Sequence, residues 1–131
     1  MTNSKTRLYT VSVASTSFTV EAYFDEQGDS PAIRFGYEQE GRKYKGGIKF
    51  TRVTATRRRA ERCCTPWHID GAYDTLVEVE HSDWVAELRA DMHERWRDAW
   101  NMHHFLVYFD STGCFEIIAE SWAALPDEPV S

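Results

Sequence analysis

The alternation of apolar and polar residues in the first half of the chain most constrains its fold. Segments 9–13, 18–24 and 33–37 each place every second residue in an apolar phase, as with Ile33, Phe35 and Tyr37. A period of two is typical of β-strands with one buried face. The first half therefore predicts an antiparallel sheet that is covered on one side.

The same pattern returns later in the chain. Segment 44–55 changes phase close to Gly46–Gly47, which predicts a bulge or bend. Segment 73–80 is expected to form another strand. Segments 105–109 and 115–119, joined by a turn-forming stretch, predict a closing hairpin.

A helical pattern separates these last strands. Trp84, Leu88, Met92 and Trp96 recur at every fourth position, and Ser82 or Asp83 can cap the first turn. The spacing predicts one helix over 83–100, about 27 Å long.

These elements together predict an α+β fold. We expect a mostly antiparallel, curved β-sheet packed against one long helix (about 83–100), followed by a final β-hairpin. Residues 1–124 are expected to form a single domain, and 125–131 a flexible C-terminal tail.

Composition excludes several classes of protein. Hydrophobic residues make up 42% and aromatic residues 14% of the 131 residues, which is too apolar for a disordered chain. No apolar run is long enough for a membrane helix, and no signal peptide is evident. Three cysteines, two of them adjacent, do not form a disulfide framework, so we expect reduced thiols and a cytoplasmic location.

The charge distribution is strongly asymmetric. Segment 42–62 holds nine of the fifteen Lys and Arg residues and one of the 21 acidic residues, although the whole chain carries a net charge of −6. We interpret this segment as a basic face for partner binding, with five candidate residues: Lys49, Arg57, Arg58, Arg59 and Arg62.

Three roles compete for this basic segment. It can offset acidic elements of the same chain, contact an acidic protein partner, or bind nucleic acid. Neighbouring side chains of a strand point to opposite faces, and the rest of the chain is acidic, so both features argue against nucleic acid. The oligomeric state stays open, with a homodimer among the alternatives.

A second group of residues suggests a ligand pocket. Cys64 and His68 follow four arginines, which could lower the pKa of a thiol, although no third orienting residue is evident. Trp67 lies in the same loop, with Tyr73 nearby, and either fills the core or anchors a partner. Glu116 could edge a cavity, because it shares its strand face with apolar residues.

The sequence predicts neither a metal site nor a cofactor. The five histidines show no H-x-x-x-H spacing and the cysteines no C-x-x-C spacing, the two patterns expected of zinc sites. No glycine-rich phosphate-binding loop is present.

Segments 73–80 and 110–122 resemble small uncharacterised bacterial proteins. The resemblance covers roughly residues 73–122 and implies no activity.

Two functional hypotheses follow. The first is a small non-catalytic interaction module, of an immunity-like or regulatory kind, that docks a partner through its basic face. The alternative is a ligand-binding or enzymatic domain with a pocket between helix and sheet, near Trp67, His68, Cys64 and Glu116.

Overall fold

The computed structural model describes residues 4–27 and 30–130. In these residues it contains nine β-strands, two short α-helices and three 3₁₀ turns. In chain order they are β1 (Lys5–Thr10), η1 (Ser15–Ser17), β2 (Phe18–Asp25), β3 (Ala32–Gln39), β4 (Arg42–Thr51), β5 (Ala55–Ala60), η2 (Glu61–Cys63), α1 (Pro66–Ile69), β6 (Thr75–Val79), α2 (Asp83–Asp91), η3 (Glu94–Trp96), β7 (His103–Phe109), β8 (Gly113–Ala119) and β9 (Ser121–Pro129).

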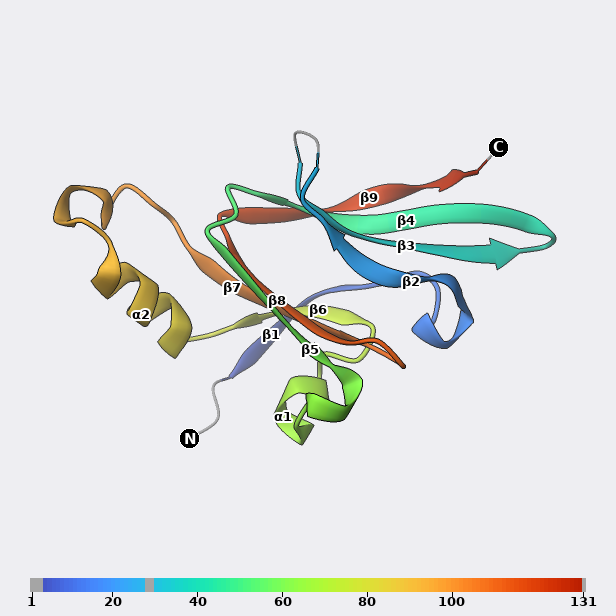
Figure 1. Ribbon diagram of the computed structural model, residues 1–131, viewed down its shortest axis with the longest axis horizontal. Helices are drawn as coiled ribbons and strands as arrows, with labels where there is room; N and C mark the ends of the chain where they lie inside the picture. The colour runs from blue at the N-terminus through green and yellow to red at the C-terminus, as the bar shows by residue number, and fades with distance from the viewer. Residues whose placement is uncertain (1–3, 28–29, 131) are drawn as a thin grey trace.

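The strands form two antiparallel sheets. Sheet A has the order β1-β6-β7-β8-β5, and sheet B has the order β2-β3-β4-β9. β8 and β9 are separated by Glu120 alone, so one continuous segment passes from sheet A into sheet B (Figure 1). The pairing of β4 with β9 shifts register between Lys45 and Gly47, where the sequence predicts a bulge.

The main core lies between the two sheets. Phe109 of sheet A packs against Phe18 and Phe35 of sheet B, with ring centroids 5.6 and 6.1 Å apart. Phe50 and Phe105 make a similar contact at 5.7 Å. The alternating apolar residues therefore bury their common face against a second sheet.

The outer face of sheet A carries a second, smaller core. Apolar residues from three adjacent strands pack beneath the loop that contains α1, from which Cys64, Trp67 and Ile69 cover them. The buried members of this cluster are Ala72, Val77, Val79, Leu106, Tyr108 and Cys114. Both faces of sheet A are thus covered over part of their area.

The prediction of one helix over 83–100 is wrong. α2 begins after Ser82, ends at Asp91, and is followed by the separate turn η3. The Arg97 guanidinium folds back and donates to the carbonyl oxygens of Ala90 (3.2 Å) and Met92 (3.1 Å). Since a helix end leaves its last carbonyls without partners, this side chain stabilises an early stop.

The α+β expectation is wrong as well. The structure is mostly β, and sheet B covers the apolar face that we expected the helix to cover. α2 instead projects beyond one end of sheet A (Figure 1). The expected hairpin forms as β7–β8, but it is not the final element, because β9 follows it and pairs with β4. Residues 125–129, where the sequence predicts a flexible tail, lie in β9.

No helix within residues 4–27 and 30–130 is long and apolar enough to span a membrane.

Candidate functional site

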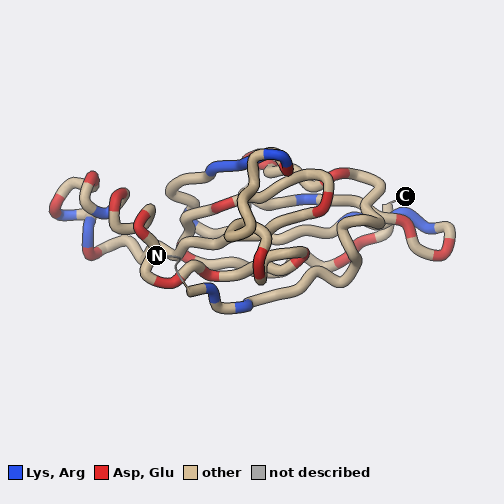
Figure 2. Tube along the Cα trace, turned by 90° about the horizontal axis from the view of Figure 1, so that it is seen from below, with Lys and Arg blue, Asp and Glu red and all other residues tan. Residues whose placement is uncertain are grey.

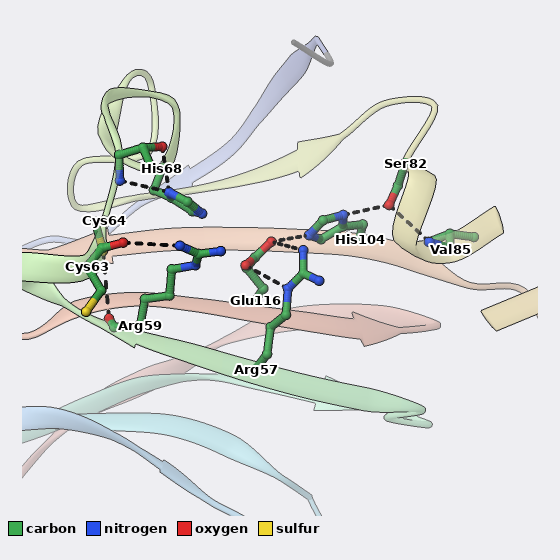
Figure 3. Close-up of polar contacts among 10 residues, drawn as sticks. Arg57, Arg59, Cys63, Cys64, His68, Ser82, Val85, His104 and Glu116 are labelled. Carbon is green, nitrogen blue, oxygen red and sulfur yellow. Dashed lines mark hydrogen bonds and ion pairs between the residues drawn. The ribbon is translucent and has the colours of Figure 1, made fainter. Parts of the chain in front are cut away.

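A buried carboxylate lies at the centre of the candidate site, on the outer face of sheet A. Glu116 of β8 is 1% exposed. Its oxygens accept hydrogen bonds from Arg57 of β5, through Nε at 2.9 Å and Nη2 at 3.1 Å, and from His104 Nε2 of β7 at 2.8 Å (Figure 3). The three residues come from three adjacent strands, whose pairing places their side chains on one face.

These contacts keep Glu116 ionised. Burial by itself would raise the pKa of the carboxyl group, but the hydrogen bonds from His104 and Arg57 and the charge of Arg57 outweigh it. The result is a pKa of about 2. A buried ion stabilises a fold only where such partners are present, and this one has them.

The hydrogen-bond chain continues from His104 to the start of α2. His104 Nδ1 lies 2.7 Å from Ser82 Oγ, which also accepts the backbone N–H of Val85 at 3.1 Å. Trp84 packs against both partners of Glu116. The centroid of its ring lies 3.9 Å from the guanidinium carbon of Arg57 and 5.2 Å from the centroid of the His104 ring, which it meets edge-on. The beginning of α2 is therefore attached to the site through both polar and aromatic contacts.

His68 approaches the same carboxylate from the other side. One ligand atom of each of His68, Cys114 and Glu116 lies within 4.8 Å of the other two, and all three residues are buried. His68 Nδ1 accepts the backbone N–H of Thr65 at 3.0 Å, which fixes the ring at the start of α1. Desolvation, followed by the nearby charge of Arg59, lowers the pKa of His68.

This trio does not fit a metal ion. Because a backbone N–H occupies His68 Nδ1, the neutral ring carries its hydrogen on Nε2, the only nitrogen left to face the cluster. To bind a metal through Nε2, His68 would need Nε2 without a hydrogen and Nδ1 as a hydrogen-bond donor, which is the opposite arrangement. The Arg57 guanidinium on Glu116 also repels a cation.

The three cysteines occupy different environments. Cys63 is exposed, Cys64 is half-buried and Cys114 is buried. Burial, followed by a hydrogen bond with Cys64, raises the pKa of the Cys114 thiol to about 12. Cys64 Sγ lies 3.5 Å from the carbonyl oxygen of Ala60 and 3.7 Å from that of Arg59. Cys114 is thus a protonated thiol at neutral pH.

The structure brings only part of the expected pocket together. His68 and Glu116 meet, with Cys64 beside Cys114 at the edge of the cluster. Trp67 packs on the outer core of sheet A, where the Lys5 ammonium lies 4.4 Å from its ring. Tyr73 is 43% exposed and packs against Tyr108 instead.

The expected basic face is divided between surfaces. In the register of β5 with β8, Arg57 lies opposite Glu116 and Arg59 opposite Cys114, and both arginines lie on the outer face of sheet A. Arg58 lies opposite Phe115 and points to the other face.

Lys49 belongs to β4, where it alternates with the core residues Ile48 and Phe50 and thus lies on the outer face of sheet B. Arg62 follows in η2 and is exposed. Positive and negative residues are interspersed along the trace in Figure 2.

Sequence reasoning missed Ser82 and His104 as members of the site. Ser82 was considered only as one of two possible helix caps, with Asp83, and the structure shows Ser82 in this position. His104 pairs with Ile118, and Glu116 pairs with Leu106, so the two polar residues are diagonal neighbours across β7 and β8. The contact can be predicted only from the register of the hairpin, that is, from which residues of β7 and β8 lie opposite each other. The alternation of apolar and polar residues does not fix this register, because a shift by two positions leaves every side chain on the same face of the sheet.

Comparison with protein-family models, curated proteins and solved structures finds no match to this chain.

Proposed function

We propose that the protein is an interaction module that binds an extended, acidic segment of a partner protein along β5. The observation that carries this proposal is that the arginine-rich strand is an edge strand. Among the described residues, β5 pairs with β8 alone and closes sheet A on that side. One row of its backbone N–H and C=O groups is therefore free of a strand partner, and such an edge can take up an added strand.

A cleft accompanies this edge. It has a volume of about 400 Å³ and lies between β5 and β2, one of the two edge strands of sheet B. Arg57, Arg58 and Phe115 line it from sheet A, and Glu21 and Tyr23 line it from sheet B. An added strand would direct alternate side chains into this cleft and the remaining ones to the outer face of sheet A.

The charge of the edge favours an acidic occupant. Arg57 is neutralised by Glu116, but Arg58, Arg59 and Arg62 form no ion pair with a carboxylate in the part of the chain described. The net charge of −6 opposes an acidic partner at a distance, yet at physiological salt charges farther away than about 8 Å are largely screened. The local arginines then dominate the interaction.

The same charges disfavour a second copy of this chain as the occupant. Antiparallel pairing of two β5 strands would place arginines opposite arginines, and like charges directly opposite destabilise a strand pair. Arginines on an edge strand also protect a protein from non-specific association.

The test uses fluorescein-labelled hexapeptides in which Glu alternates with Val, and matched peptides in which Lys replaces Glu. We expect the acidic peptide to bind, with shifts in the backbone amide NMR signals of residues 55–60 and with affinity that falls as salt rises. The double variant Arg58→Glu/Arg62→Glu should weaken binding by about tenfold or more, since each charge-assisted contact contributes about 1 kcal/mol or more.

The matched control is Lys43→Glu/Lys45→Glu, which makes the same change of charge on exposed positions of β4. Equal loss of binding in both variants would show an unspecific charge effect and refute the proposed surface. Binding without perturbation of residues 55–60 would refute strand addition.

A further inference from the structure

Ser82, His104 and Glu116 form a continuous hydrogen-bonded line (Figure 3). Ser82 Oγ lies 2.7 Å from His104 Nδ1, and His104 Nε2 lies 2.8 Å from Glu116 Oε1. They come from the connection after β6, from β7 and from β8, and all three residues are buried.

The directions of these hydrogen bonds follow from their donors. Ser82 Oγ accepts the Val85 N–H, and its own hydrogen can be donated to His104 Nδ1. With the imidazole neutral, Nε2–H donates to the Glu116 carboxylate, which is an acceptor only. The serine hydroxyl therefore faces a base, and a carboxylate holds that base in the matching tautomer.

Next to this line there is room for a small substrate. A pocket of about 400 Å³ is lined in part by Ser82, Met102, His103 and His104. Glu78 also lines it, and its Oε2 lies within hydrogen-bond distance of His103 Nδ1, at 2.7 Å.

The backbone N–H groups of Asp83 and Trp84, the first two of α2, have no acceptor within the helix, because they begin it, and they lie at the same end as Ser82; the third, that of Val85, donates to Ser82 Oγ. Such groups can stabilise a developing oxyanion.

We propose that Ser82 is a nucleophile for acyl transfer, with His104 as general base and Glu116 as the residue that orients it, acting on small carboxylic esters. Ser82 Oγ bonds to the carbonyl carbon of the ester while its proton moves to His104 Nδ1. The bond to the alcohol oxygen breaks, and this oxygen takes the proton from His104. Water then attacks the acyl-serine, losing a proton to His104, and the proton returns to Ser82 as the acid leaves.

The competing role for Ser82 is purely structural, because a serine at this position caps the helix. Ser82→Asn separates the two roles: asparagine caps a helix about as well as serine but provides no hydroxyl nucleophile. This activity is independent of partner binding at β5, and the control variant Lys43→Glu/Lys45→Glu on β4 should leave it unchanged.

The experiment measures covalent labelling of the folded protein by a fluorophosphonate probe, with the modified residue identified by mass spectrometry. We expect labelling at Ser82 and turnover of p-nitrophenyl acetate, both absent in Ser82→Asn at unchanged melting temperature. His104→Gln should slow labelling by about 100-fold, the usual effect of losing a general base.

Absence of labelling in the wild-type protein, or equal labelling of Ser82→Asn, overturns the proposal. If His104→Gln does not fold, the comparison of wild type with Ser82→Asn still decides the outcome.

Discussion

Replacing Glu116 by Gln should lower the free energy of unfolding by about 3 kcal/mol at pH 7. The pKa of this carboxyl group falls from 4.5 to about 2 in the folded protein. One pKa unit corresponds to about 1.4 kcal/mol, so the fold stabilises the charged form by about 3 kcal/mol. Because Glu116 is only 1% exposed, solvent does little to reduce this contribution.

The pH dependence gives a sharper test than the value at pH 7. A carboxyl group whose pKa is lowered by folding stabilises the protein above its unfolded pKa, and the contribution is lost as pH falls toward the folded value. The difference between wild type and Glu116→Gln should therefore be constant from pH 7 to about 5.5. It should shrink to about 1 kcal/mol at pH 3 and approach zero near pH 1. Urea unfolding followed by tryptophan fluorescence measures it at each pH.

The matched control is Glu120→Gln. Glu120 lies next to β8 and forms a surface ion pair with Arg52 at 3.4 Å, in which both side chains are more than a third exposed. Such a pair contributes about 1 kcal/mol at most. If Glu116→Gln costs no more than this control, or if its cost does not change with pH, the buried charge cluster is not what stabilises this face of sheet A.

Three further predictions concern separate parts of the fold. Gly113→Ala should lower the free energy of unfolding, measured in urea, by about 3 kcal/mol or more. The reason is that Gly113 has φ of 122° and an added Cβ would lie 2.0 Å from a backbone oxygen of β5. The control Gly41→Ala should lower it by about 1 kcal/mol, because a Cβ at Gly41 meets no atom within 4 Å. At pH 8, iodoacetamide should modify Cys63 and leave Cys114 intact in the folded protein, since burial raises the pKa of Cys114 to about 12, and intact-mass spectrometry with and without urea checks this. Arg97→Ala should accelerate hydrogen exchange in the last turn of α2 by about fivefold, the effect of losing about 1 kcal/mol of hydrogen bonding.

Local patterns predicted the strands better than their arrangement. Ile33, Phe35 and Tyr37 alternate because one face of β3 is buried, and this fact is visible in the sequence. The residues that cover that face come from β7 and β8, far along the chain, and no local pattern indicates them. The helix was overestimated because the Arg97 side chain donates to the nearby carbonyl oxygens of Ala90 and Met92 and stabilises an early end, while the apolar spacing continues as far as Trp96.

The candidate site was predictable in part. Glu116 was singled out because it appeared to share a strand face with Ile118 and Trp122, but Trp122 lies in β9 and packs in the core between the sheets. The residue was therefore identified on partly incorrect grounds. Its contact with His104 depends on strand register, and its contact with Arg57 on the pairing of β5 with β8 across 59 residues of sequence.

The continuous segment β8–β9 has a consequence for how the chain folds. β2, β3 and β4 are consecutive and pair with their neighbours, so they can associate as soon as residue 51 is available. β5 has to wait for β8, about sixty residues later, and β4 gains its second neighbour only when β9 is present. Pairing over such sequence separations slows folding, because the loop must close before contacts compensate for the lost entropy. During synthesis on a ribosome, neither sheet can be completed until residues 113–129 have emerged, and until then the arginine-rich strand has no partner on either side.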